Sequence, residues 1–171
     1  MHSYYKVSML AVGILAFFVL SLGCEKDVDA GLTAPDFSLP DLSGQNTSLK
    51  QFQGQVVILD FWATWCFPCR MSIPELVKIQ EKYRDKGLVI LGISLDNPMR
   101  TTNKALMAFK NKFGINYRIL RYDINVIRAY FGQSNPAIPT MFLIDRNGKI
   151  KSKIVGFRPD ALKNSLANLL K

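Results

Sequence analysis

The fold is decided by one stretch of the chain, Asp60-Phe61-Trp62-Ala63-Thr64-Trp65-Cys66-Phe67-Pro68-Cys69-Arg70. It follows Val56-Val57-Ile58-Leu59, an apolar run of the kind that fills a strand buried on both faces. It precedes a segment with helical periodicity, in which Leu76, Ile79 and Tyr83 fall on one stripe. The pattern therefore places two cysteines where a strand ends and a helix begins.

The position of Cys66 favours a nucleophilic sulfur. Unpaired amides and the positive end of the dipole at a helix start stabilise an anion, here the thiolate. Cys69 falls about one helical turn further on, close enough to attack a mixed disulfide on Cys66 and release the partner. Pro68 lacks an amide hydrogen, which costs nothing in the first turn, and Trp65 supplies a flat apolar surface beside the sulfur. The spacing predicts Cys66 as the nucleophile and Cys69 as the resolving thiol.

Two other interpretations of the cysteine pair are possible. Half of a zinc site would need further ligands, but the remaining cysteine is Cys24 and the one histidine is His2, so we expect no metal. A purely structural disulfide would close so short a loop that it restrains little of the unfolded chain. Redox chemistry is the better explanation.

These residues carry a family resemblance. The run Asp60 to Arg70, continued by Met71-Ser72-Ile73-Pro74-Glu75-Leu76, resembles the active-site segment of thioredoxin-like proteins, specifically the exported TlpA/ResA-like thiol-disulfide oxidoreductases. Ala34-Pro35-Asp36-Phe37-Ser38-Leu39 resembles the A-P-x-F-x-L opening of redoxin (AhpC/TSA-like) domains. The resemblance implies an α/β, thioredoxin-like fold: a central mixed sheet flanked by helices, with an N-terminal hairpin and an inserted helix-strand unit. It also implies an enzyme whose only redox group is the Cys66–Cys69 disulfide, without a separate cofactor.

The resemblance assigns a role to Asp60. Many exported members have Asn there, whereas thioredoxin has Asp, so Asp60 is similar to the buried carboxylate that moves the proton of the resolving cysteine. Burial would raise its pKa toward the range useful for a general base. The alternative is a polar strand end that faces water.

A second expected part of the site is Ile138-Pro139-Thr140, which opens an apolar strand, Met141 to Asp145. A proline at the start of a central strand needs a reason. In thioredoxin-like folds the corresponding segment carries a cis peptide bond, packs against the cysteine pair and binds the substrate strand through its backbone. The resemblance therefore implies substrate binding by Trp65, Phe67, Pro68, Ile138, Pro139 and Thr140.

Other segments give the architecture around this site. Leu88 to Ser94 is a second apolar strand, expected to run parallel to 56–60 because the segment between them is helical. Asp96 follows that strand and is interpreted as the cap of the next helix rather than as a second carboxylate near the cysteines. Further helices are expected at 102–113, 123–131 and 157–170, a short strand at 115–120, and hairpins at 37–49 and 141–155.

The N-terminus predicts export. Val7 to Leu22 is an apolar run of 16 residues, roughly 24 Å of helix against a hydrocarbon core of about 30 Å, which indicates a signal peptide over residues 1–23 rather than a membrane span. Leu20-Ser21-Leu22-Gly23-Cys24 resembles a bacterial lipobox, which implies lipidation of Cys24, although Ser21 stands where the usual box has Leu. Cleavage without lipidation and an uncleaved anchor stay open. Residues 24–33 would be a tether and 34–171 one thioredoxin-like domain.

Composition and charge limit the partners. With 171 residues, of which 49% are hydrophobic and 20% charged, the chain has an ordinary globular composition. Its net charge of +9 is spread along the sequence without a nucleic-acid-reading motif, so we expect no nucleic acid partner. The family implies protein thiols and disulfides as substrates, apocytochrome c among them, a transmembrane thiol-reductant carrier as electron source, and a membrane-anchored location facing the periplasm or extracytoplasmic space.

Three other functions stay open at this point. A thiol peroxidase would share the opening motif, but the P-x-x-x-T-x-x-C pattern is missing from the strand-helix junction. A disulfide-forming oxidant would use the same cysteine pair in the opposite direction. A binding module or metal chaperone would need more metal ligands than the chain offers outside its expected signal peptide.

Overall fold

The computed structural model describes residues 31–171. The expected signal peptide (1–23), the expected lipidation site Cys24 and residues 24–30 of the expected tether lie outside the described residues. Within residues 31–171, no helix has both the length and the apolar character that crossing a bilayer requires.

A five-stranded mixed sheet forms the centre of the domain, with the strand order β5-β4-β3-β6-β7. β3 pairs in parallel with β4, and β4 with β5, whereas β6 pairs antiparallel with both β3 and β7. A separate antiparallel hairpin of β1 and β2 precedes it. The strands are β1 (Ser38–Pro40), β2 (Asn46–Ser48), β3 (Val56–Trp62), β4 (Leu88–Ser94), β5 (Arg118–Arg121), β6 (Thr140–Ile144) and β7 (Ile150–Val155).

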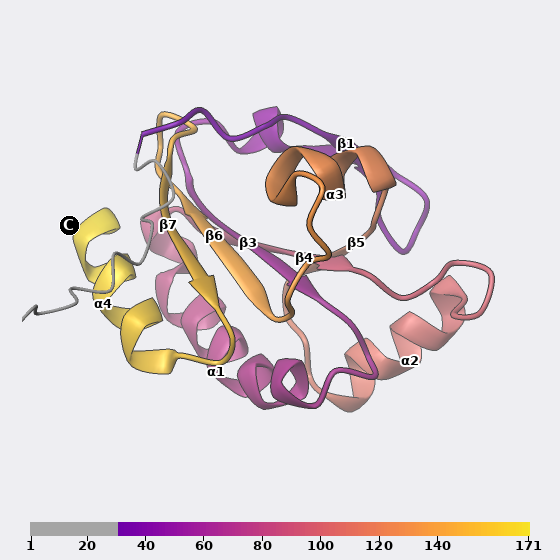
Figure 1. Ribbon diagram of the computed structural model, residues 1–171. Coiled ribbons are helices and arrows are strands. Elements are labelled where there is room, and N and C mark those ends of the chain that lie inside the picture. The colour runs from indigo at the N-terminus through magenta and orange to yellow at the C-terminus, as the bar shows by residue number, and fades with distance from the viewer. Residues whose placement is uncertain (1–30) are drawn as a thin grey trace, which may run out of the picture.

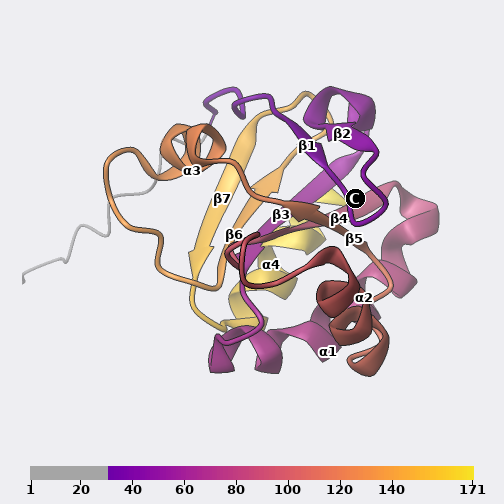
Figure 2. The same cartoon turned by 90° about the vertical axis from the view of Figure 1, so that its right-hand side faces the viewer.

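Helices cover both faces of this sheet (Figures 1 and 2). Figure 1 shows α1, α2 and α4 on one side and α3, with the β1–β2 hairpin, on the other. The expected thioredoxin-like architecture is confirmed, including the inserted unit, which consists of α2, β5 and α3 between β4 and β6. The helices are η1 (Leu49–Phe52), α1 (Phe67–Tyr83), η2 (Arg84–Lys86), α2 (Asn103–Lys112), α3 (Ile124–Phe131) and α4 (Pro159–Leu169).

The alternation of side chains along β3 divides the interior into two cores. Val56, Ile58 and Trp62 pack with α1, α2 and α4, whereas Val57, Leu59 and Phe61 pack with α3 and the N-terminal hairpin. Since all seven residues of β3 are buried, the run of apolar side chains in the sequence reflects burial on both faces. Asp60 lies in the series that faces α1.

The folded unit begins earlier than the expected boundary at residue 34. The amide of Gly31 donates to the carbonyl oxygen of Ile150 at 3.0 Å, and the amide of Ile150 donates to the carbonyl of Leu32 at 2.9 Å. Thr33 also forms a bridge with Lys149. Residues 31–33, expected to belong to the tether, are therefore paired with the start of β7.

Candidate active site

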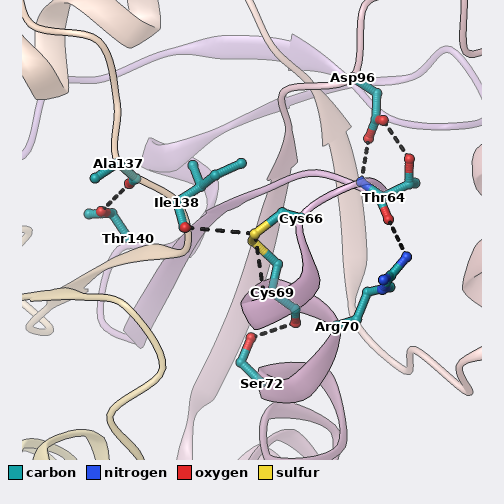
Figure 3. Close-up of a disulfide and its surroundings, with 9 residues drawn as sticks. All are labelled: Thr64, Cys66, Cys69, Arg70, Ser72, Asp96, Ala137, Ile138 and Thr140. Carbon is teal, nitrogen blue, oxygen red and sulfur yellow. Dashed lines mark hydrogen bonds between the residues drawn. A yellow bond between two sulfur atoms is a disulfide. The ribbon is translucent and has the colours of Figure 1, made fainter.

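Cys66 and Cys69 lie at the junction between β3 and α1 and are joined by a disulfide (Figure 3). Cys66 is the N-cap of α1, and its Sγ accepts a hydrogen bond from the backbone amide of Cys69 at 3.2 Å. Pro68 lies in the first turn, where a missing amide hydrogen leaves no helical bond unmade. After reduction the same amide can donate to the Cys66 sulfur, which favours its thiolate form.

The two cysteine residues differ in exposure. Cys66 retains 5% of its surface, whereas Cys69 is 0% exposed and lies behind it. Trp65 and Phe67 flank Cys66 and are 67% and 64% exposed, and Pro68 beside them is exposed too. A partner disulfide can therefore reach Cys66 first, next to a rim of exposed apolar side chains.

The loop before β6 lies against the cysteines. The Ile138–Pro139 peptide bond is cis, as expected, and the carbonyl oxygen of Ile138 lies 3.7 Å from Sγ of Cys66. The Thr140 hydroxyl donates to the carbonyl of Ala137 at 2.6 Å (Figure 3). Because the side chains of Pro139 and Thr140 are buried, they shape this loop from within, whereas Ile138 is partly exposed beside Cys66.

Asp60 is buried in β3, on the face that packs against α1. Only 1% of its surface is exposed, and its Oδ1 has no hydrogen-bond partner within residues 31–171. Burial raises the pKa of this carboxyl from 3.8 to about 7. The alternative of a strand end facing water is thus wrong, and Asp60 can exchange a proton near neutral pH.

Asp96 has a different place from the one expected. It does not cap the next helix, because the N-cap of α2 is Thr102, whose hydroxyl accepts from the amide of Ala105 at 3.2 Å. Asp96 is 1% exposed and accepts hydrogen bonds from the amide and the hydroxyl of Thr64, at 3.0 and 2.6 Å, and from the hydroxyl of Ser94 at 2.8 Å. Local sequence favours a helix cap for an aspartate in a loop. It cannot reveal that the actual hydrogen-bond partner is Thr64, which lies 32 residues earlier in the chain.

This carboxylate fixes the loop that leads to the nucleophile. Thr64 precedes Cys66 by two residues, and two of the three hydrogen bonds that the Asp96 carboxylate accepts come from Thr64 (Figure 3). The guanidinium of Arg70 lies 3.5 Å from the Thr64 carbonyl on the other side. The sequence contained one indication of this role: Asp96 follows β4 at the carboxyl ends of the parallel strands, the edge where sites form in such sheets.

No group of three or more His, Cys, Asp or Glu side chains in the described part of the chain is arranged to hold a metal ion. A redox-active disulfide at the start of a helix, facing a cis-proline loop across the end of a mixed sheet, defines the class of thioredoxin-like thiol-disulfide oxidoreductases.

Comparisons with known proteins agree with this class. The sequence profile described as the AhpC/TSA family matches residues 30–153. The chain is 38% identical over 131 residues to the thiol-disulfide oxidoreductase ResA of Geobacillus thermodenitrificans, covering 75% of this chain and 71% of that protein. It is 36% identical over 132 residues to the thioredoxin-like protein YneN of Bacillus subtilis, covering 77% and 75%.

A solved structure shows the same fold. The crystal structure of a thiol:disulfide interchange protein of the thioredoxin family from Chlorobium tepidum superimposes with a TM-score of 0.72 at 29% identity, covering 82% of this chain and 97% of that one. The chain belongs to the AhpC/TSA family. Within it, the relatives bear out the resemblance to ResA-like thiol-disulfide oxidoreductases.

Proposed function

We propose that this protein reduces disulfides of partner proteins outside the cytoplasm, with Cys66 as nucleophile, Cys69 as resolving thiol and Asp60 as the group that accepts the proton. One observation carries the proposal: Cys66 caps α1 and is more exposed than the fully buried Cys69 to which it is bonded, and the unpartnered buried carboxyl of Asp60 lies on the face of β3 that packs against α1.

The reaction proceeds in two exchanges. The thiolate of Cys66 attacks a sulfur of the partner disulfide, so that a mixed disulfide forms and the partner's other sulfur leaves with the electron pair. The S–H bond of Cys69 then breaks, its proton passes to the Asp60 carboxylate, and its sulfur attacks Cys66. The Cys66–Cys69 disulfide forms, and the partner's second sulfur leaves as a thiolate. The partner is reduced by two electrons and the cysteine pair is oxidised by two.

The surface around Cys66 supports protein substrates. Trp65, Phe67 and Pro68 offer exposed apolar area on one side of the sulfur, and Ile138 lies on the other. Aromatic side chains contribute much contact area at little cost in entropy, as interfaces require. We assign substrate contact to these four residues, and to Pro139 and Thr140 the shaping of the loop.

The direction and the setting rest on the sequence and on the relatives. Ile138 is the residue that thioredoxin has before its cis-proline, which favours reduction. The expected signal peptide and the lipobox-like Cys24 favour a membrane-anchored protein facing the periplasm or extracytoplasmic space. Apocytochrome c as a substrate and a transmembrane thiol-reductant carrier as the electron source are part of the proposal, on the family resemblance alone. The Cys66–Cys69 pair would act without a further cofactor.

The reduction potential tests the direction. The purified protein is equilibrated in glutathione buffers of graded ratio, and the fraction of reduced Cys66–Cys69 is measured by alkylation and mass spectrometry. We expect a potential nearer the value of thioredoxin, about −270 mV, than that of the strong periplasmic oxidant DsbA, about −120 mV. A value close to −120 mV would contradict the reductive direction. The Cys66→Ala, Cys69→Ala double variant gives the background from Cys24.

A further inference from the structure

Asp60 lies beside other buried polar atoms without partners. Five buried side-chain nitrogen or oxygen atoms in residues 31–171 have no hydrogen-bond partner, and three of them are Oδ1 of Asp60, Nε1 of Trp62 and Oη of Tyr117. Trp62 is 1% exposed and Tyr117 is 4% exposed. Buried polar atoms in folded proteins are nearly always bonded, either to protein or to an internal water.

Gly92 brings these three groups together. It is the register partner of Asp60 in β4, and neighbouring strands lie about 4.8 Å apart. A Cβ at Gly92 would lie 2.9 Å from Nε1 of Trp62 and 3.2 Å from Cε2 of Tyr117. The two rings therefore occupy the space that a side chain at Gly92, beside Asp60, would fill. This places two neutral donor groups on the same side of the sheet as the unpartnered Asp60 oxygen.

The pKa of Tyr117 also indicates that its hydroxyl lies near Asp60. The pKa of Tyr117 is raised well above its ordinary value, first by burial and then by the negative charge of Asp60. The buried or partly buried titratable groups on the surrounding elements include Cys69 on α1, Lys110 on α2, Asp96 after β4 and Arg121 at the end of β5. The ammonium of Lys110 donates to the backbone carbonyl of Tyr117 at 2.8 Å, and Arg121 donates to the carbonyl of Thr101 at 3.0 Å. The shift at Asp60 has burial as its cause and no charged partner.

We propose that Tyr117 is a positioning residue for the resolving step: its hydroxyl and the Trp62 indole N–H hold the Asp60 carboxylate, through one internal water, in the orientation that accepts the proton of Cys69. This inference rests on the proposed role of Asp60. In the step itself the Cys69 S–H bond breaks, the proton moves to Asp60, and Tyr117 stays protonated throughout. Its hydroxyl stabilises the ionised carboxylate without exchanging a proton with it.

Tyr117→Phe tests this role, because it removes one hydroxyl and keeps the ring. Two quantities are followed against pH: the titration midpoint of the Asp60 carboxyl by 13C NMR, and the rate at which a preformed mixed disulfide on Cys66 releases its peptide. Loss of a donor disfavours the ionised carboxylate, so both midpoints move upward and the release rate at pH 6.5 falls about three- to tenfold. Gly92→Ala, which would displace both rings, moves the midpoints as well.

Tyr130→Phe is the matched control. Its hydroxyl donates to the Pro35 carbonyl at 2.7 Å on the opposite face of the sheet, so its removal lowers stability and leaves both midpoints in place. If the Asp60 midpoint is unchanged in both Tyr117→Phe and Gly92→Ala, the proposed interaction between Tyr117 and the Asp60 carboxylate is wrong. If the midpoint shifts but the pH profile of peptide release does not, Tyr117 does not position Asp60 for the resolving step. Asp60→Asn in the same assay separates this from the proposed function: if it leaves release unaffected, Asp60 is not the proton acceptor, whatever Tyr117 does.

Discussion

Replacing the buried carboxyl by an amide makes the stability of the protein much less dependent on pH. The pKa of Asp60 is about 7 in the folded protein against 3.8 in the unfolded chain. Below pH 3.8 the group is neutral in both states. Between the two values the unfolded chain releases the proton and the folded protein keeps it, so stability falls by about 1.4 kcal/mol per pH unit as pH rises. Above pH 7 the loss is complete.

The expected size of the effect follows from that difference. About three pH units at 1.4 kcal/mol each give about 4 kcal/mol, the upper end of what one buried group contributes. Asp60→Asn has the same shape and no such titration. The free energy of unfolding of the variant, relative to the natural protein, should therefore rise by about 4 kcal/mol between pH 4 and pH 8.

Urea unfolding of the oxidised proteins at several pH values measures this difference, with the disulfide intact so that neither cysteine titrates. Asp85→Asn is the control, because it removes a carboxyl that lies exposed in η2 and is not desolvated by burial. A stability difference between Asp60→Asn and the natural protein that stays constant from pH 4 to pH 8 would refute the reasoning. It would mean that Asp60 ionises as readily in the folded protein as in the unfolded chain.

The remaining predictions concern the loop and the rim of the site. Asp96→Ala leaves the Thr64 amide and two hydroxyls without their acceptor, and should lower the free energy of unfolding by about 2–4 kcal/mol and slow disulfide exchange, whereas Asp96→Asn should cost less. Urea titration and peptide-disulfide kinetics check this, and equal stability of Asp96→Ala and the natural protein would contradict it. Trp65→Ala and Phe67→Ala should leave stability within about 0.5 kcal/mol, because both side chains are exposed, but should raise KM for a protein disulfide more than they lower kcat. Met99→Ala, at another highly exposed apolar residue, is the control, and an equal effect on KM there would count against the assigned surface.

Local patterns were sufficient to predict most of the fold. The strands Val56–Trp62 and Leu88–Ser94 appear as apolar runs, and Gly87, with a φ of 79°, ends the helical segment between them, as a glycine after a helix predicts. β3 extends two residues beyond the expected end at Asp60, because pairing with β4 and β6 continues past it. β5 covers Arg118–Arg121 instead of the expected 115–120. Only these four residues pair with β4, opposite Leu91–Ser94.

The parts of the site that lie within short sequence motifs could be predicted. Cys66, Cys69 and the Ile138–Pro139 bond could be found from motifs, and the burial of Asp60 from the resemblance to thioredoxin. The anchoring of Thr64 by Asp96 and the grouping of Trp62 and Tyr117 beside Asp60 could not, because each joins residues from different strands or loops. Gly92 is the clearest case: its missing side chain has meaning only once β4 is placed next to β3.

Trapping of the mixed disulfide shows which of the two cysteines attacks the partner. Reduced Cys69→Ser and Cys66→Ser variants, each with Cys24 replaced by Ala, are mixed with a disulfide-bonded peptide, and the adducts are located by mass spectrometry. The account predicts a rapid, stable adduct on Cys66 in the first variant, and little or none on the fully buried Cys69 in the second. Adducts that form equally fast on Cys69, or none on Cys66, would contradict it.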